Sequence, residues 1–449
     1  MEPLDGKTEK TSDFVTVSTR LQRIAELARK APEMVLHSLS HHIDVEFLRR
    51  AYELTRKDGA VGVDEQTASA YEANLTANLV SLHERFKAGT YRAPPVKRVH
   101  IPKGDGSKTR PIGIPTFEDK VLQRAAVMVL NAVYEQDFLD CSYGYRPGRS
   151  AHQAIEALWK GLMDMGGGWV LEADIKGFFD NLDHSHLRDL LDLRVRDGVL
   201  RRVINKWLKA GVLEDGNLSY PEAGTPQGGV VSPVLANVYL HEVLDKWFEG
   251  EVKPRLKGHA FLIRYADDFV IAFELEADAK RVWDVLPKRF GRFGLTLHPD
   301  KTRIIPFTRP TRRGGENPGT FDLLGFTHFW GSTLKGGWAV KRATSESRFS
   351  RALKRIDEWC RTNRHQPLNE QAKKLAQKFR GHCQYYGITG NSRALGRFLY
   401  WLRRIWFKWI KRRSQHAKKT WDWFSELLVR VNFPQARAVR SVLRHAANP

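Results

Sequence analysis

Apolar residues recur at helical spacing along much of the chain. In the N-terminal third, this spacing predicts helices over residues 18–38, 43–57, 117–135 and 150–163. Because the apolar positions fall on one side of each predicted helix, these segments are expected to pack around a shared core.

The same pattern predicts further helices towards the C-terminus. Ser232 suits the N-cap and Pro233 the first helical position, so a helix is expected from there to about residue 248. Close to the C-terminus, three apolar stripes flanked by Lys and Arg predict three amphipathic helices with their cations outward. The stripes are Phe349, Leu353, Ile356 and Trp359; Leu368, Ala372, Leu375 and Phe379; and Leu395, Phe398, Leu399, Leu402, Ile405, Trp406 and Trp409.

Segments rich in β-branched and aromatic residues lie between these helices. WVLEADI (169–175) predicts a strand, and FLIRY and FVIAF around a short polar tip (261–273) predict a hairpin. Residues 95–116 contain too much Pro and Gly for a helix, and a turn at 104–106 predicts a second hairpin there. A strand-like segment, FDLLGFTHFW, follows at 321–330.

Composition indicates a folded chain. Of its 449 residues 42% are hydrophobic and 13 are Trp, which argues against disorder and, at roughly 150 residues per domain, allows two to four domains. The three cysteines form no CxxC pair, which excludes a disulfide framework and a cysteine-based zinc site. No apolar leader and no run of about 18 apolar residues is present, so a soluble cytoplasmic protein without a membrane partner is expected.

The positive charge is concentrated near the C-terminus. Residues 341–449 contain 26 Lys and Arg against six Asp and Glu, a net charge of +20 out of +22 for the whole chain. Six of the 13 Trp lie in the same region. A folded basic region rich in aromatic residues favours a polyanionic partner, above all a nucleic acid, over a merely solvated surface or an acidic membrane.

Two acidic sites stand beside apolar strands. Asp174 follows the strand-like run 169–173, and Asp267 and Asp268 form the tip of the hairpin at 261–273. Carboxylates in such places are costly unless they are paired, capped or bound to a metal. Two such tips brought together would make an oxygen-rich site for divalent cations, although turn chemistry alone explains most Asp-Asp pairs.

The segments around these carboxylates resemble, in order, the motif series of reverse transcriptases, most closely those encoded by group II introns. RYADD (264–268) is similar to the YxDD active-site hairpin, EADIKGFFD (172–180) to the motif of the first catalytic aspartate, and GTPQGGVVSP (224–233) to the TPQGG-x-x-SP signature. The remaining matches are KTRPIGIP (108–115) and SYGYRPGRS (142–150) for the fingers, GLTLHPDKT (294–302) and FDLLGF (321–326) for the palm, and KFRGHCQYYG (378–387) for the maturase or thumb segment.

The resemblance covers roughly residues 40 to 440 and implies an α+β fold. This is the right-hand polymerase, with fingers, a ferredoxin-like palm that carries the active-site hairpin, and an α-helical thumb. The implied domains are an N-terminal helical extension (1–60), fingers (61–168), palm (169–340), thumb or maturase region (341–415) and a short basic DNA-binding region (416–449). No cysteine follows Cys383, and the chain resembles the intron proteins that lack an endonuclease domain.

The family's functional residues carry over by position. Asp174, Asp267 and Asp268 are the implied catalytic residues and metal ligands, with Ile175 lending its carbonyl oxygen. The implied nucleotide contacts are Lys103 and Arg110 on the triphosphate, Gln227 beside the nascent base pair, Phe179 as the ring that excludes a 2′-hydroxyl, and Lys301 near the leaving pyrophosphate. The implied RNA or DNA contacts are Arg146, Arg149, Gly228, Gly229, Lys378, Arg380, Tyr385, Tyr386, Arg403 and Arg404.

Some of these positions have a structural alternative. Phe178 and Phe179 could both belong to the core; because they are neighbours on an expected strand and face opposite sides, only one of them can face the sugar. Tyr385 and Tyr386 could pack within a helix or stack on bases. Gly228 and Gly229 are expected to allow a close approach to a strand.

The resemblance also implies the activity and its partners. The chain would be an RNA-directed DNA polymerase with two Mg²⁺ ions, or Mn²⁺ in their place, in a bacterial-type cytoplasm. Its partners would be dNTPs, an RNA template with a DNA or RNA primer, target DNA, and the group II intron RNA whose splicing and mobility it assists. The alternatives are a domesticated reverse transcriptase in defence or repair, and a non-catalytic RNA-binding splicing factor, against which the three intact aspartates argue.

Overall fold

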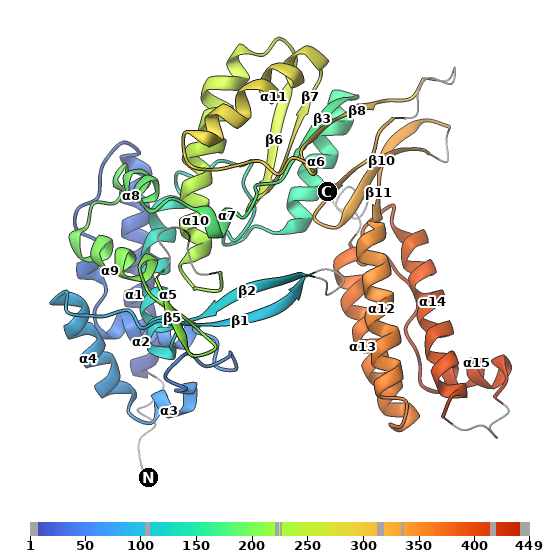
Figure 1. Ribbon diagram of the computed structural model, residues 1–449, viewed down its shortest axis with the longest axis horizontal. Coiled ribbons are helices and arrows are strands. Elements are labelled where there is room, and N and C mark those ends of the chain that lie inside the picture. Colours follow the sequence, from blue (N-terminus) through green and yellow to red (C-terminus); the bar gives the residue numbers. More distant parts are fainter. Residues whose placement is uncertain are drawn as a thin grey trace. The chain divides into compact units, whose positions relative to one another are not determined.

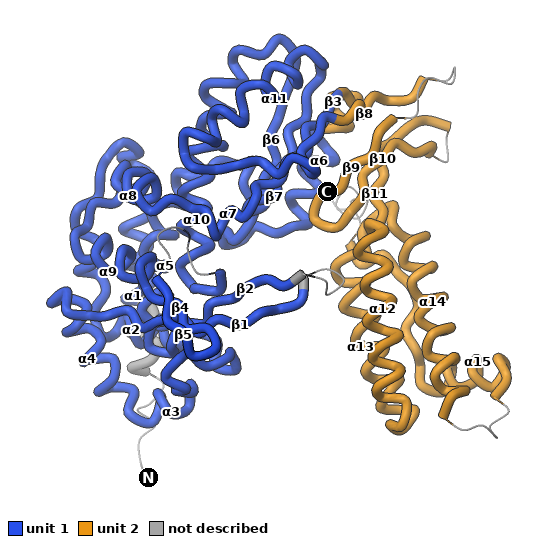
Figure 2. The backbone as a smooth tube through the Cα atoms, in the orientation of Figure 1, with its two compact units in different colours: residues 1–161, 169–304 blue, residues 162–168, 305–449 orange. Residues whose placement is uncertain are grey.

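Figure 1 shows the computed structural model of the chain, which describes residues 8–103, 108–220, 224, 227–311, 318–333, 336–413 and 419–440. The chain divides into two compact units (Figure 2). The first comprises residues 1–161 and 169–304, and the second comprises residues 162–168 and 305–449. The short segment 162–168 thus belongs to the unit that is otherwise built from the C-terminal third of the chain.

Helices form most of the first unit. Those predicted over 117–135 and 150–163 are confirmed as α5 (Phe117–Tyr134) and α6 (Ala151–Met165). The helix predicted over 18–38 is α1 (Thr8–Lys30), which ends early because Pro32 disfavours a helical conformation in the residue before it. The other helices are α2 (Val45–Leu54), α3 (Ala68–Glu72), α4 (Leu75–Lys87), α7 (Phe178–Asn181), α8 (His184–Asp192), α9 (Gly198–Leu208), α10 (Ser232–Leu240) and α11 (Glu276–Gly291).

The hairpin predicted in the Pro- and Gly-rich segment is confirmed. β1 (Val96–Lys103) and β2 (Lys108–Ile114) pair in antiparallel fashion, from Lys97 opposite Ile114 to Lys103 opposite Lys108. β4 (Val212–Glu214) continues this sheet parallel to β1, and β5 (Asn217–Ser219) closes it. The turn predicted at 104–106 lies outside the described residues.

The acidic hairpin is confirmed as well. β6 (Ala260–Tyr265) and β7 (Asp268–Phe273) pair up to Tyr265 opposite Asp268, which leaves a two-residue tip. β7 also pairs with β3 (Gly167–Ala173), from Trp169 opposite Phe273 to Ala173 opposite Phe269. Because β7 lies between the other two strands, the chain positions that follow β3 and precede β7 meet at one end of the sheet.

The helix predicted from Ser232 differs in its details. Its N-cap is Val231, and Ser232 and Pro233 form the first turn of α10, so the cap lies one residue earlier than predicted. After Leu240 the backbone widens into π-helical turns over His241–Asp245 and Trp247–Val252. The helical path therefore reaches past the expected residue 248, but with a changed register that re-aims its side chains.

A fully buried arginine ties these elements together. Arg264 on β6 is 0% exposed and forms an ion pair with Asp245, which is also 0% exposed, with its Nε 2.7 Å from Asp245 Oδ1. Its other nitrogens donate to Asn237 Oδ1 (3.0 Å), to Ser142 Oγ (2.7 Å) and to the carbonyl of Ala266 (3.1 Å). One guanidinium thus joins the π-helical turn, α10, the segment after α5 and the hairpin tip.

The second unit has a small sheet and a helical bundle with its own core. β10 (Phe326–Ser332) lies between β9 (Phe321–Leu323) and β11 (Trp338–Thr344), and β8 (Arg303–Thr308) leads into the unit. The segment 162–168 takes part, since the amide of Val340 donates to Met163 Sδ at 3.2 Å. The three amphipathic helices predicted there are confirmed, and a fourth helix follows them: α12 (Glu346–Thr362), α13 (Leu368–Tyr386), α14 (Ser392–Lys411) and α15 (Trp421–Arg430).

Two buried polar side chains of this bundle, Trp406 and Gln371, are hydrogen-bonded to each other. Trp406 is 0% exposed, and its indole nitrogen donates to Gln371 Oε1 at 2.9 Å. Gln371 in turn donates to the carbonyl of Gln366 at 2.8 Å, just before α13 begins.

Within the part of the chain that the structure describes, no helix combines the length and the apolar character needed to cross a lipid bilayer.

The ion pair of Arg264 yields a stability prediction. Asp245→Ala leaves a buried guanidinium without its counter-charge, so the free energy of unfolding should fall by about 3–5 kcal/mol. Lys246→Ala, at the residue after Asp245, is the control. It removes only the exposed ion-pair partner of Glu242, so the free energy of unfolding should fall by no more than about 1 kcal/mol. Urea titrations followed by tryptophan fluorescence measure both; equal losses would contradict the importance of the pair.

Candidate active site

The tip of the acidic hairpin is held in an unusual backbone conformation. Ala266 has a φ of 58°, in the left-handed region, and the next two residues are Asp267, which is half-buried, and Asp268, which is exposed. A Cβ atom added to Gly144 would lie 2.2 Å from the Ala266 nitrogen. Asn237 Nδ2 also donates to the carbonyl of Gly144 at 2.7 Å. Only glycine fits at position 144, and its close approach fixes the tip.

The third carboxylate joins this tip through the sheet register. Asp174 directly follows Ala173, the last residue of β3 that pairs with β7, so it emerges beside Asp268. Its backbone carbonyl accepts from the amide of His298 at 2.7 Å, and its carboxylate forms an ion pair with Lys301. The side chain of Asp174 is 23% exposed. The sequence prediction that these three aspartates gather at one place is therefore consistent with the fold.

The backbone after Asp174 turns an oxygen towards the same place. Ile175 lies opposite Leu297 in an antiparallel bridge. The hydrogen bonds of this bridge are made by the residues on either side of the pair, since Lys176 N donates to the Thr296 carbonyl at 2.8 Å. In such a pair the residue's own amide and carbonyl point the other way. The Ile175 carbonyl therefore points to the side on which β3 faces β7, where the hairpin tip lies.

These donors suit a hard divalent cation. The aspartates and the Ile175 carbonyl offer only oxygen ligands. The Asp174 carboxylate already attracts a positive charge, since the ammonium group of Lys301 forms an ion pair with it. Among the described residues, no group of three or more His, Cys, Asp and Glu side chains is gathered closely enough to hold a metal by itself. Mg²⁺ needs no such cage, because it is commonly bound by one or two carboxylates together with substrate phosphates and water.

Arg110 and Tyr145 border the same place. Arg110 is exposed on β2. Burial, and then the charge of Asp267, raises the pKa of the Tyr145 phenol, whereas Arg110 lowers it, so both charges act on this phenol. Sequence reasoning missed Tyr145, although its position next to Gly144 in the SYGYRPGRS motif was a signal. The side chain of Lys103 lies outside the described residues.

Phe179 lies on a helix and not on the strand that was expected. Gly177, with a φ of 57°, ends the extended backbone, and Phe178 and Phe179 begin α7. The prediction that one ring is core and the other is available still agrees with their burial: Phe178 is 2% exposed, and Phe179 is half-buried against it with ring centroids 5.3 Å apart. The helical turn, and not strand alternation, separates the two rings.

Gln227 connects this helix to the β1–β2 hairpin. Its carbonyl accepts from Gly113 N at 2.6 Å, and its Nε2 donates to Asp180 Oδ1 at 3.2 Å. Gly228 has a φ of 113°, and a Cβ atom there would lie 2.7 Å from the Gly113 carbonyl oxygen. The expected close approach of the glycine pair to a strand is thus present for Gly228, and Gly229 beside it is buried.

A buried carboxylate supports the loop that follows. Asp119 is 2% exposed and accepts from Tyr91 Oη (2.6 Å), Trp207 Nε1 (2.6 Å) and Gln123 Nε2 (3.1 Å). Gln123 Oε1 accepts in turn from the amides of Val230 (2.7 Å) and Val231. Burial raises the pKa of Asp119 to about 6. The loop after Gly228 is therefore held by Gln123, which is itself held by the buried carboxylate of Asp119.

The two arginines expected to contact nucleic acid near β2 differ in exposure. Arg146 is 7% exposed; its guanidinium pairs with Glu135 at 3.1 Å and donates to the carbonyls of Leu139 (2.7 Å) and Ser142 (2.9 Å). These contacts give Arg146 a structural role in closing the segment after α5. Arg149 is half-buried and pairs with Asp140 at 2.5 Å.

The expected contacts in the second unit also separate by exposure. Tyr385 Oη donates to the Leu324 carbonyl at 2.8 Å, and the rings of Tyr385 and Tyr386 both pack on Phe326. Packing thus accounts for both tyrosines. Lys378, Arg380 and Arg404 are exposed, with Arg404 over the exposed rings of Tyr400 and Trp401, whereas Arg403 is half-buried.

Comparisons with known proteins agree with this geometry. The family profile described as reverse transcriptase (RNA-dependent DNA polymerase) matches residues 101–328, and that of the group II intron maturase-specific domain matches residues 349–426. The first match contains the acidic hairpin, Asp174 and Gln227. The second covers most of the helical bundle of the second unit.

Individual relatives point in the same direction. The chain is 43% identical over 187 residues to the group II intron-encoded protein LtrA of Lactococcus lactis subsp. cremoris, which covers 41% of this chain and 30% of LtrA. It is 32% identical over 325 residues to protein YkfC of Escherichia coli, covering 64% of this chain and 84% of YkfC. It is 24% identical over 447 residues to a putative COX1/OXI3 intron 2 protein of Saccharomyces cerevisiae, covering 87% of this chain and 49% of that protein. The match thus spans less than a third of the length of LtrA.

The close approach of Gly144 to the hairpin tip is testable. Gly144→Ala forces the new methyl group against the Ala266 backbone, and the strain should cost about 1–3 kcal/mol and loosen the tip. Hydrogen–deuterium exchange of the peptide 260–273 should become faster. Gly250→Ala is the control, because its methyl group would meet no atom within 4 Å, and it should leave this exchange unchanged. Unaltered exchange in Gly144→Ala would show that the tip does not depend on this contact.

Proposed function

We propose that this chain, which belongs to the reverse transcriptase family of group II intron-encoded proteins, is an RNA-directed DNA polymerase that also assists its intron RNA in splicing and mobility. The observation that carries the proposal is the strand register, which brings Asp174 after β3 and the Asp267–Asp268 tip before β7 to one end of the β6–β7–β3 arrangement, within a match to the polymerase family. A surface that only bound RNA would have no use for carboxylates there, since they repel phosphates.

The proposed active site assigns a task to each group. Asp174, Asp267 and the Ile175 carbonyl would hold two Mg²⁺ ions, with Asp268 as a further carboxylate of the site. When bound, the metal ions would activate the primer 3′-hydroxyl and neutralise charge on the phosphates. Lys103 and Arg110 would hold the triphosphate, since Lys and Arg suit phosphate oxygens.

The chain's own residues would then align the reactants. The primer 3′-oxygen forms a bond to the α-phosphorus of a dNTP while the bond to the bridging oxygen breaks, and pyrophosphate leaves. Lys301, which forms an ion pair with Asp174, would stabilise the negative charge on that leaving group. Gln227 would support the nascent base pair, because its backbone is anchored to Gly113 and its side chain to Asp180.

The remaining proposals concern the partners and the domains. In the right-hand arrangement, the β1–β2 hairpin would belong to the fingers, the β3–β7 region to the palm, and α12–α14 to the thumb. The net charge of +20 over residues 341–449 supports contacts of the thumb and the basic C-terminal region with intron RNA, primer–template and target DNA. Exposed cations such as Lys378, Arg380 and Arg404 are the proposed contacts, because buried side chains cannot reach a phosphate.

The carboxylates provide the direct test of the polymerase. Asp174→Asn and Asp267→Asn keep the side-chain volume but remove the charge, so primer extension on an RNA template should fall by at least about a hundredfold. Filter binding of the same RNA should stay close to the wild-type value, since the carboxylates do not hold the template. Full extension by either variant would overturn the proposed site, and a wild-type chain that binds RNA without extending a primer would favour a non-catalytic splicing factor.

Phe179 tests the proposed choice of sugar. Phe179→Ala opens space beside the sugar, so the ratio of ribonucleotide to deoxynucleotide incorporation should rise about tenfold or more, the effect of about 1–3 kcal/mol of steric discrimination. The matched control is Phe178→Ala, which removes a ring of the core and should lower stability without changing this ratio. Steady-state kinetics with both nucleotide types measure this ratio. If the ratio rose only in Phe178→Ala, Phe179 would not be the residue that selects the sugar.

A further inference from the structure

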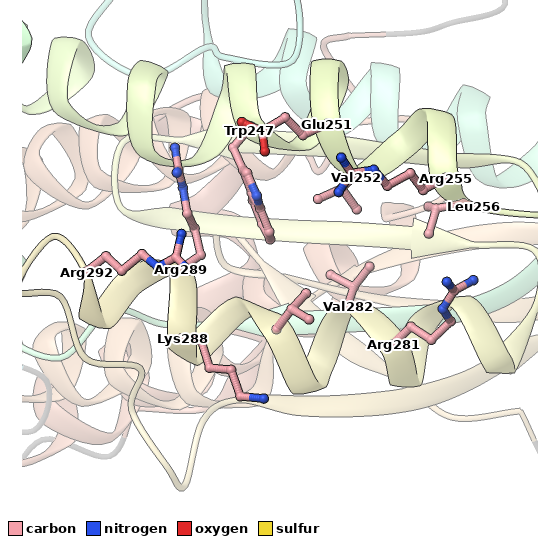
Figure 3. A pocket seen from close by; sticks show the side chains of 11 residues that line it. Trp247, Glu251, Val252, Arg255, Leu256, Arg281, Val282, Lys288, Arg289 and Arg292 are labelled. Atoms are coloured by element: carbon pink, nitrogen blue, oxygen red, sulfur yellow. The ribbon is translucent and has the colours of Figure 1, made fainter.

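A groove in the first unit lies away from the proposed active site. It runs between the π-helical turn Trp247–Val252 and α11 and has a volume of about 390 Å³ (Figure 3). Its walls come from both helical segments: Trp247, Glu251, Val252, Arg255 and Leu256 on one side, and Arg281, Val282, Val285, Lys288, Arg289 and Arg292 on the other. None of the proposed catalytic or nucleotide-binding residues lines it.

The rim of the groove is strongly cationic. Five of its side chains carry a positive charge and one, Glu251, a negative charge. Arg289 has a structural task, because its Nε and Nη2 donate to the carbonyls of Val243 (3.1 Å) and Glu242 (3.0 Å). The other four, Arg255, Arg281, Lys288 and Arg292, are exposed along the rim. So much charge of one sign in a concave site favours an anionic ligand.

The floor is apolar and contains a tryptophan. Trp247 and Val282 are 8% and 1% exposed, and Val285 is exposed to 41%. Figure 3 shows the indole of Trp247 between the two helical segments, next to the side chains of Arg289 and Val252. The Arg289 guanidinium lies 5.8 Å from the centre of the indole. A floor of this kind gains free energy from a flat apolar group rather than from a phosphate.

We infer that the groove binds single-stranded RNA, with an unstacked base on the apolar floor and the flanking phosphates on the rim cations. Aromatic surface together with cations is the combination that retains unpaired strands, and the volume lies in the range of small-ligand sites. A duplex would offer the floor no base. The inference rests on the proposed function in one respect, namely that RNA is the polyanion this chain meets, and it adds a contact separate from the polymerase site.

Photocrosslinking locates the contact on the full chain. The probe is a short oligouridylate that carries 4-thiouridine, and crosslinked peptides are identified by mass spectrometry. We expect crosslinks within residues 247–256 or 281–292. The variant Arg255→Ala/Lys288→Ala/Arg292→Ala should reduce their yield about tenfold, because each lost phosphate contact weakens binding.

A matched variant controls for charge alone. Lys246→Ala/Lys257→Ala/Lys280→Ala removes the same number of exposed cations from the same part of the chain, but none of them lines the groove. Its crosslinking yield in these peptides, and its primer extension, should equal those of the wild type. Trp247→Phe, which keeps most of the ring volume in case larger changes prevent folding, should reduce the yield while retaining the melting temperature within a few degrees.

The outcomes separate this inference from the polymerase proposal. Absence of crosslinks in these two segments, or equal yields in both triple variants, overturns the groove as an RNA site even if the chain extends primers. Displacement of the crosslinks by oligoglutamate, but not by further RNA, would assign the groove to an acidic protein and also overturn it. Groove crosslinks on a chain that does not extend primers would overturn the polymerase instead.

Discussion

The burial of Arg264 is the constraint on which the first unit depends. A guanidinium that is fully removed from water must have every strong donor satisfied, and here Asp245, Asn237, Ser142 and the Ala266 carbonyl do so. Ser142 lies more than a hundred residues before Arg264 in the chain, whereas the other three partners lie within 30 residues of it. Because the same guanidinium binds the residue that precedes Asp267, the requirement to satisfy a buried charge also positions the acidic hairpin.

Local patterns predicted much of this fold, because helices and hairpins leave periodic traces in the sequence. The confirmed elements include α5, α6, the β1–β2 and β6–β7 hairpins and the helices α12, α13 and α14 of the second unit. Local reasoning failed where one residue changes the backbone, as at Gly177, which turns the expected strand at Phe178 into a helix, and at Pro32, before which α1 ends at Lys30 and not at residue 38. The nucleic-acid contact that the resemblance implies for Arg146 stays a prediction, and the structure gives this buried arginine partners in Glu135, Leu139 and Ser142.

The sequence predicted the aspartates of the candidate site, but it did not predict the residues that hold the surrounding backbone in place. The aspartates are conspicuous because carboxylates beside apolar strands need a reason. By contrast, the hydrogen-bond relay from Asp119 through Gln123 to Val230 and Val231 joins residues that are far apart in sequence. Tyr145 was missed for the same reason, since only the folded chain brings its phenol within reach of the charges of Arg110 and Asp267.

The membership of segment 162–168 in the second unit has a consequence for synthesis on the ribosome. Translation delivers the chain from its N-terminus, so every residue of the first unit has been made once Ile304 is added. Gly167, however, meets Phe307 and Trp330 only after they have been added, and Met163 meets Val340 later still. A nascent chain therefore carries this segment without its native neighbours for much of its elongation, and a pause or truncation before residue 340 would leave apolar surface exposed to chaperones and proteases.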